Sequence, residues 1–227
     1  MVFPIGDDDS ALRGRHHPVT LLLILANVAV FFLQLSQGED IERFFLMWAV
    51  VPLEYAQGAD LPPAIPLPFW STLFSSMFMH GGWAHLGGNM LYLWIFGDNV
   101  EDAMGRVKYL LFYLLCGVIA AAAQILVDPA SRIPSLGASG AISGVLAAYL
   151  VLYPKQQVRV FLLRGIVYMP ALIVIGMWIV FQFVNGIGQL AQTEETGGVA
   201  YAAHIGGFLA GLVLVGFFRT RRAARAI

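Results

Sequence analysis

The segment VAYAAHIGGFLAGLVLVGFF, residues 199–218, is long and apolar enough to cross a lipid bilayer as a helix. A hydrocarbon core of about 30 Å requires roughly 20 apolar residues. The segment also carries His204, followed at helical spacing by Gly207 and Gly211. These three positions share one helical face, so the histidine can come close to a neighbouring helix. The segment therefore predicts a membrane helix that packs tightly within a bundle.

Five other apolar segments of similar length precede this one. Together they predict six membrane helices, at about 18–36, 83–100, 107–127, 137–153, 165–185 and 199–218. The 227 residues are 59% hydrophobic and 12% charged, whereas soluble domains are about half apolar and a quarter charged. We expect an all-α polytopic membrane protein with one domain over 18–218, a short cytoplasmic segment over 1–17 and a basic cytoplasmic tail over 219–227.

The positive charges indicate how the bundle is oriented. Of the 13 Lys and Arg residues, all except Arg43 and Arg132 fall before the first helix, after the sixth, or in the loops on that same side. Cytoplasmic loops are enriched in such residues, so both termini are expected in the cytoplasm. The compact chain with short tails suggests a prokaryotic plasma membrane. The polar stretch 1–17 is followed by no cleavage pattern, so the first apolar block is expected to be a membrane helix and not a signal peptide.

The segment 37–70 is expected to form a long loop on the outer side. It combines five acidic residues with the apolar, aromatic run 44–48. This combination predicts a segment that lies in the membrane interface. Five prolines in the same segment exclude one continuous helix.

The composition also excludes some functions. The net charge of −1 and the absence of a basic stripe argue against binding to nucleic acid. Cys116 is the single cysteine, so no internal disulfide can form, and we expect it to be a small residue facing lipid or core.

A serine bracketed by glycines opens the fourth predicted helix, in the sequence GASGAISG of residues 137–144. Ser139 falls in the first turn, where unpaired N–H groups and the helix dipole favour a developing negative charge. This position suits a nucleophile. The alternative is helix packing, because Gly140 and Gly144 form the small-xxx-small pair found at contacts between membrane helices.

Histidines within the apolar segments are the other candidates for function, because ionisable groups are costly there. His204 suits the base that activates a serine, although a packed hydrogen-bonding role or a proton relay would also explain it. His85 and Asn89 are four residues apart on the second helix, so they can converge on one point as oxyanion donors. The alternative is a hydrogen bond that orders the bundle. For His80, outside this spacing, we expect a structural role.

Together these motifs resemble those of the rhomboid family of intramembrane serine proteases. His-x-x-x-Asn in the second helix, Gly-x-Ser-Gly at the start of the fourth and Ala-His-x-Gly-Gly in the sixth occur in the family's order. The run FMH at 78–80 and residues 96–109 also look like the family's second-to-third helix region. The resemblance covers most of the chain and implies a six-helix rhomboid bundle.

The resemblance implies a role for each motif. Ser139 would attack the scissile carbonyl and form an acyl-enzyme, while His204 would take and return the proton. The oxyanion would be held by the Ser139 backbone N–H and by the side chains of His85 and Asn89. No metal or cofactor is implied. The fourth and sixth helices contain no acidic residue, so we expect a dyad without an orienting carboxylate.

One position departs from the pattern of some family members, which carry an aromatic ring four residues after the serine, stacked on the histidine. Here this residue is Ser143. We therefore expect His204 to be oriented by helix packing or by a hydrogen bond, including one to Ser143.

The expected substrates are single-span membrane proteins with Gly, Pro or small polar residues near the outer membrane face, because cleavage requires a helix to unwind. Entry is expected from the side, past the fifth helix. The loop 186–198, which includes Gly186 and Gly188, would be a mobile cap, with Trp178 and Phe181 as candidate gate residues.

Two other classes of function fit part of the pattern. A catalytically silent rhomboid-like protein would bind membrane clients without cutting them, but such proteins lack the serine or the histidine, and this chain has both. A small transporter would use His85, Asn89 and His204 as a polar pathway. It would be expected to show internal repeats, and the two halves of the sequence show none.

Overall fold

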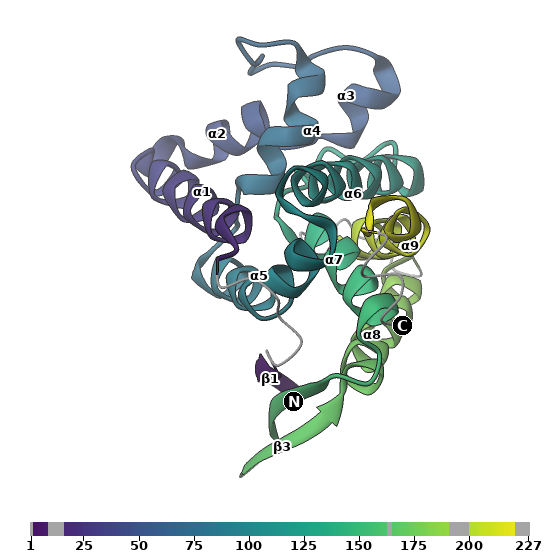
Figure 1. Cartoon of the computed structure of the whole chain (residues 1–227). Helices are drawn as coiled ribbons and strands as arrows, with labels where there is room; N and C mark the ends of the chain where they lie inside the picture. The colour runs from purple at the N-terminus through teal and green to yellow at the C-terminus, as the bar shows by residue number, and fades with distance from the viewer. Residues whose placement is uncertain (1, 9–15, 163–164, 191–199, 221–227) are drawn as a thin grey trace.

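The computed structural model describes residues 2–8, 16–162, 165–190 and 200–220. Six helices of 14 to 22 residues form the body of the molecule. They are α1 (Pro18–Leu35), α5 (Trp83–Met104), α6 (Arg106–Val127), α7 (Ser139–Leu152), α8 (Ala171–Leu190) and α9 (Tyr201–Phe218). The helix α7 lies at the centre and contacts α5, α6, α8 and α9, while α1 packs on α5 (Figure 1).

The central position of α7 follows from its sequence of apolar and small residues. Every residue in 140–149 is buried. The helix α9 approaches its backbone directly, since a β-carbon on Gly207 would collide with the carbonyl oxygen of Gly140. A β-carbon on Gly211 would likewise collide with the carbonyl oxygen of Gly144. These glycines let the two helices meet without side chains between them.

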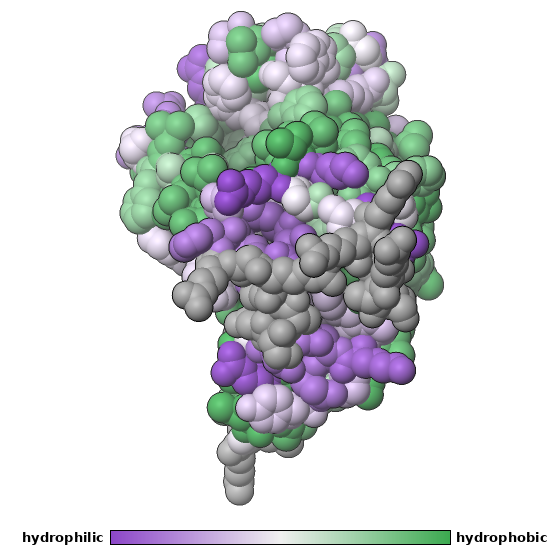
Figure 2. Space-filling view, viewed as in Figure 1, coloured by the Kyte–Doolittle hydropathy of each residue, from purple (hydrophilic) through white to green (hydrophobic). Residues whose placement is uncertain are grey.

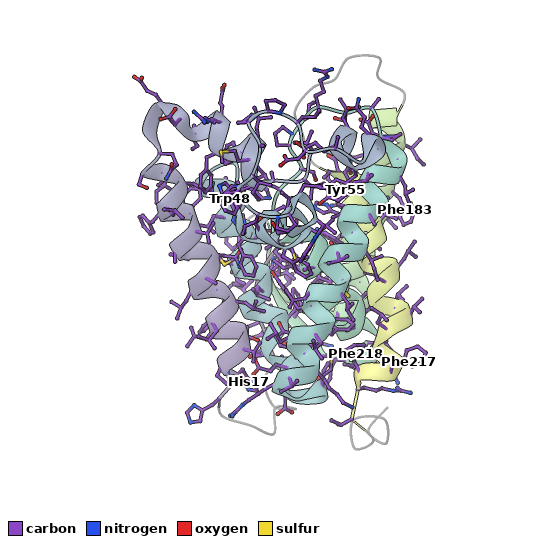
Figure 3. The ribbon with its side chains drawn as sticks, turned by 90° about the horizontal axis from the view of Figure 1, so that it is seen from above. His17, Trp48, Tyr55, Phe183, Phe217 and Phe218 are labelled. Carbon is purple, nitrogen blue, oxygen red and sulfur yellow. The ribbon has the colours of Figure 1, made fainter. Side chains whose placement is uncertain are left out.

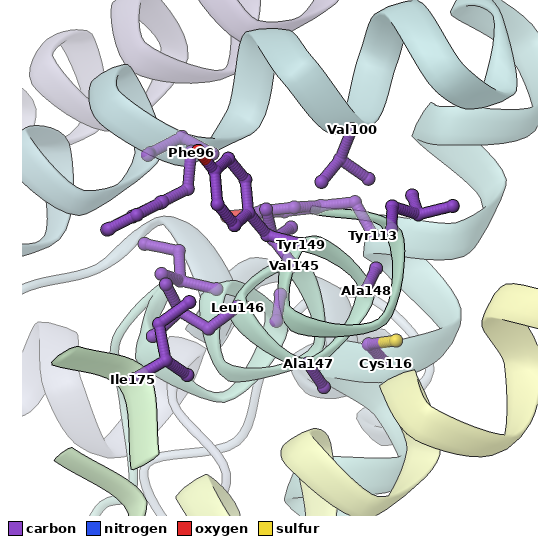
Figure 4. Close-up of a cluster of buried hydrophobic side chains, with 14 of the residues drawn as sticks. Phe96, Val100, Tyr113, Cys116, Val145, Leu146, Ala147, Ala148, Tyr149 and Ile175 are labelled. Atoms are coloured by element: carbon purple, nitrogen blue, oxygen red, sulfur yellow. The ribbon is translucent and has the colours of Figure 1, made fainter. Parts of the chain in front are cut away.

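Larger side chains fill the other sides of α7 (Figure 4). Phe96 of α5 packs edge-on against Tyr149, with ring centroids 4.9 Å apart. Cys116 of α6 and Ile175 of α8 approach from other directions, and both are fully buried. Cys116 therefore faces the core and not the lipid.

The expectation of an all-α fold was wrong, although the chain is mostly helical. Three antiparallel strands form a sheet in the order β1 (Val2–Asp7), β2 (Gln157–Leu162) and β3 (Gly165–Pro170). Hydropathy predicts that residues 165–170 belong to the fifth helix, but they form β3, and the helix begins at Ala171. Their sequence GIVYMP is rich in residues that favour strands. Hydropathy alone does not distinguish a short apolar strand from the start of a helix.

Within the described residues, four helices are long and apolar enough to be candidate membrane spans: α1, α6, α9 and the part Ala171–Gly188 of α8. The helix α7 is apolar but has only 14 residues, and α5 carries His85, Asn89 and Asp98. The count of six spans therefore remains a prediction. Large apolar side chains are exposed on the outer helices, for example Leu126 and Phe217. In the space-filling view, hydrophobic residues gather toward the periphery over α1 and α6 (Figure 2).

The segment before α5 forms short helices at one end of the bundle. They are the α-helices α2 (Ile41–Trp48), α3 (Pro52–Gln57) and α4 (Thr72–Ser75), and the 3-10 turns η2 (Gly38–Asp40), η3 (Phe69–Ser71) and η4 (Ser76–Phe78). This agrees with the expectation that prolines prevent one continuous helix. Trp48 and Tyr55 lie at the end opposite His17 and Phe218 (Figure 3).

Buried carboxylates fasten the opposite end. Glu101 of α5 accepts hydrogen bonds from the backbone N–H groups of Val19 and Thr20, at 3.1 and 2.8 Å, and so caps the start of α1. Asp7 of β1 accepts from the Tyr149 hydroxyl at 2.6 Å and from the Asn99 amide at 2.9 Å. The sheet is thereby tied to α5 and α7.

Candidate active site

Ser139 is the first residue of α7, as the sequence predicts. The preceding turn depends on Gly137, whose φ of +130° is rarely adopted by other residues. The backbone N–H of Gly137 donates to the carbonyl of Ser76 at 2.9 Å, which anchors the turn on η4. The N–H groups in the first turn of a helix have no partner within the helix. This turn therefore presents the Ser139 hydroxyl beside available backbone donors.

His85 reaches this turn from α5. A β-carbon on Gly137 would lie 2.8 Å from His85 Nε2 and 3.4 Å from Ser139 Oγ, so the two side chains flank the same glycine. The backbone N–H of Gly81 donates to His85 Nδ1 at 3.4 Å. Since Nδ1 accepts, the neutral ring carries its hydrogen on Nε2. That N–H is the one beside Ser139.

Asn89 lies one turn further along α5 and is 8% exposed. Its Nδ2 is buried and makes no hydrogen bond among the described residues. Buried amide groups are nearly always paired, and an unpaired one calls for an explanation. A free donor one turn from His85 is what an oxyanion site requires.

His204 lies on α9, beside the point where α9 meets α7. A β-carbon on Gly140 would lie 3.8 Å from the carbonyl oxygen of Ala203. The helix contact thus joins the residue after Ser139 to the residue before His204. Within the described part of the chain, no hydrogen bond links the Ser139 hydroxyl to the His204 ring. Such bonds are often long in an enzyme without substrate.

The imidazole of His204 is held by α8. Its Nδ1 donates to Oε1 of Gln182 at 2.7 Å, and both residues are buried. The ring of Trp178, one turn before Gln182, lies 5.8 Å from the His204 ring at an interplanar angle of 36°. His204 is thus oriented by a hydrogen bond, as expected, but the partner is Gln182 and not Ser143, whose hydroxyl donates to the Ser139 carbonyl at 2.6 Å. The aromatic neighbour comes from α8 instead.

Gln182 is the site residue that the sequence analysis missed. It lies between Phe181 and Phe183 in a largely apolar helix, and an amide in such a helix was the available signal, although the same helix also contains Asn185 and Gln189. Which side of α8 faces His204 was not visible in the sequence. Phe181, proposed for the gate beside Trp178, is 60% exposed and does not share the side of Gln182.

The proposed cap over 186–198 also needs correction. Gly186 and Gly188 lie within α8, which continues to Leu190, because glycine lowers helix propensity without ending a helix and no proline interrupts this one. The rest of that segment, 191–199 with Gly197 and Gly198, lies outside the described residues.

His80 is buried beside His85, with ring centroids 5.1 Å apart. Its backbone N–H donates to the side-chain oxygen of Gln34 at 3.0 Å, and its carbonyl accepts from the Gln34 amide at 2.8 Å. The backbone at His80 is therefore tied to α1, as a structural role would require.

The site as a whole combines a hydroxyl, two imidazoles and an unpaired amide. These groups suit acyl transfer, which needs a nucleophile, a base and donors for an oxyanion. Among the residues that the structure describes, no three His, Cys, Asp or Glu side chains group closely enough to hold a metal ion.

The bundle of apolar helices defines a multi-pass membrane protein. A family model described as the Rhomboid domain matches residues 68–221, a span that includes Ser139, His204, His85 and Asn89. The chain belongs to the rhomboid family.

Several relatives are similar over most of this chain. Rhomboid protein 1 of Saccharomyces cerevisiae mitochondria is 27% identical over 90% of this chain and 54% of its own length. The rhomboid protease GluP of Bacillus subtilis is 32% identical over 86% of this chain and 34% of its own. The rhomboid protease GlpG of Yersinia pestis is 25% identical over 95% of this chain and 68% of its own. This chain therefore spans about half of the length of the yeast relative and about a third of the length of the Bacillus relative.

Proposed function

We propose that this protein is an intramembrane serine endopeptidase, which hydrolyses peptide bonds in or near the transmembrane segments of other membrane proteins. The observation that carries the proposal is the turn at Gly137, with the Ser139 hydroxyl on one side and His85 Nε2 on the other. Relatives named as rhomboid proteases support it.

In the proposed reaction, Ser139 Oγ bonds to the scissile carbonyl carbon as its proton passes to His204 Nε2. This nitrogen is free to accept because Nδ1 holds the hydrogen that it donates to Gln182. The resulting oxyanion accepts hydrogen bonds from the Ser139 N–H, His85 Nε2 and Asn89 Nδ2. His204 then gives the proton to the leaving amine.

The acyl-enzyme is then hydrolysed, with water as the attacking group and Ser139 as the leaving group. His204 takes a proton from water, the hydroxide attacks the ester carbon, and the same donors hold the second oxyanion. Ser139 leaves with the proton that His204 returns. No residue of this scheme requires a metal or cofactor.

The membrane arrangement is part of the proposal. Six spans over 18–218 would place the segment 1–17 and the tail 219–227 in the cytoplasm, and the short helices between α1 and α5 at the outer face. The Arg and Lys distribution supports this orientation. The substrates would be single-span membrane proteins, which reach the site from the lipid.

A catalytically silent client-binding protein is the alternative. The presence of both Ser139 and His204, with His85 and the Asn89 amide near the same turn, favours catalysis, because a silent member would be expected to lack the serine or the histidine.

The test is cleavage of a reconstituted single-span substrate by the wild type and by Ser139→Ala and His204→Ala. Both variants should lose activity, and a fluorophosphonate probe should label wild-type Ser139 but not the His204 variant. Cleavage by Ser139→Ala at the wild-type rate would refute the proposal. A wild type that shows no labelling of Ser139 and no cleavage of any membrane substrate would favour the client-binding alternative.

A further inference from the structure

The hydrogen bond between Gln182 and His204 joins α8 to α9 along a stretch of α8 in which no other side chain is fully buried. Of residues 176–188 in α8, all of which the structure describes, Gln182 alone is buried. The buried apolar residues Val174 and Ile175 lie near the other end of this helix. We call 176–188 the distal half of α8. Its one buried side chain is polar and is directed at His204.

The beginning of α8 is fixed by contrast. The N–H of Ala171 donates to the carbonyl of Gln156 at 2.9 Å, and that of Leu172 to the carbonyl of Pro154 at 3.1 Å. The helix also continues directly from β3, which pairs with β2 along its whole length. One end of α8 is thus anchored to the sheet, while in the distal half the apolar side chains that contact the core, Trp178 and Ile179, are only partly buried.

The bond also decides which nitrogen of His204 is basic. An amide oxygen can only accept, so Nδ1 must carry the hydrogen, and Nε2 is left with its lone pair. Without the amide, both tautomers are open to the ring, and one of them cannot act as a base toward Ser139. The bond becomes stronger when the ring is charged during the reaction. Trp178 adds a second contact from the same face of α8.

We propose that Gln182 is a positioning residue that orients His204 and, because it lies on the distal half of α8, makes the competence of the base depend on this half being packed against α9. The proposal rests on the proposed serine protease function. If the distal half of α8 moved away from α9, His204 would lose its partner and its orientation. The Ser139–His204 dyad would then form only when this half of α8 packed against α9 again.

The test compares two variants. Gln182→Leu keeps a similar side-chain volume but removes the acceptor, whereas Gln182→Glu keeps an acceptor for His204 Nδ1. Asn185→Leu is the matched control, since the Asn185 amide donates to the carbonyl of Phe181 in its own helix. Gln182→Leu should label with a fluorophosphonate roughly 10- to 100-fold more slowly, the range for a hydrogen bond to a charged group. Gln182→Glu should label faster than Gln182→Leu, because it keeps an acceptor for Nδ1, and Asn185→Leu should be unchanged.

Two measurements separate positioning from a structural role. With a reconstituted membrane substrate, Gln182→Leu should lower kcat and leave KM unchanged. The ¹⁵N spectrum of His204 should show hydrogen on Nδ1 in the wild type and a mixture of tautomers in Gln182→Leu. Hydrogen exchange should become faster over 176–188 in that variant. Gln182→Met offers a second apolar replacement if Gln182→Leu does not fold.

Labelling of Gln182→Leu at the wild-type rate, or a wild-type ring with hydrogen on Nε2, would overturn the inference. So would a rise in KM at constant kcat, which would make Gln182 a substrate contact. These results differ from failure of the proposed function, in which Ser139→Ala would still cleave the substrate.

Discussion

His85 Nε2 and Gly137 are in contact across 52 residues of sequence: a β-carbon on the glycine would lie 2.8 Å from that nitrogen. The contact fixes the His85 N–H beside Ser139, and it leaves no space for a larger residue at 137.

Gly137→Ala should therefore impair catalysis and stability together. The methyl group would push the His85 ring away, and the φ of +130° would cost about 1–3 kcal/mol for a residue with a β-carbon. Thermal unfolding in detergent and cleavage rates measure the two effects. Gly58→Ala is the control, because Gly58 also has a positive φ of +64° but no neighbour within 4 Å. Gly58→Ala should be destabilised by the same kind of backbone strain but should cleave substrate at the wild-type rate. Equal loss of turnover in both variants would contradict the contact.

Gly207→Ala should separate α7 from α9. Its β-carbon would collide with the Gly140 carbonyl, and overpacking of this kind costs about 1–3 kcal/mol. We expect a lower unfolding temperature and slower labelling of Ser139, because His204 moves with α9. Gly216→Ala, on the same helix with no atom within 4 Å, should be neutral or slightly stabilising. A stable, active Gly207→Ala variant would show that the helices are not in backbone contact.

Asn89→Ala should separate activity from stability. Loss of one oxyanion donor lowers turnover by roughly 10- to 1000-fold. The Nδ2 group has no partner among the described residues, so its removal breaks no hydrogen bond and should leave the unfolding temperature nearly unchanged. Turnover and thermal unfolding of one preparation provide the measurement. Marked destabilisation with normal turnover would instead assign Asn89 to the structure of the bundle.

A cross-link between α8 and α9 should block access to the site while leaving the dyad intact. A β-carbon on Gly186 would lie 3.2 Å from that of Tyr201, close to the separation found in disulfides. In Gly186→Cys/Tyr201→Cys, oxidation should abolish cleavage of a membrane substrate but preserve labelling by a small fluorophosphonate. Reduction should restore cleavage. The single-cysteine variants are the controls, and full cleavage in the oxidised state would mean that substrates enter elsewhere.

The sequence by itself determined most of the helices and the position of Ser139 at the start of one of them. The helices at 106–127, 139–152 and 201–218 agree with their predicted segments to within two residues, because apolar length and the 3.6-residue repeat are local properties. The pairing of His85 with Asn89 on one helix follows from the same repeat. The helical spacing of Gly207 and Gly211 likewise predicted the face of this helix that packs closely on a neighbour.

Only the tertiary structure decided what each polar group meets. Residues 165–170 form a strand because 157–162 offers them hydrogen bonds, and hydropathy carries no record of that partner. Gln182 is one of three amide residues in the sequence of α8, and only the placement of this helix against α9 shows that it meets His204, 22 positions away. An apolar pattern predicts that a helix is buried away from water. It does not distinguish contact with lipid from contact with the protein core, because both are apolar. Which side faces a neighbour depends on the packing of all the helices together, and this packing gave the histidine its amide partner.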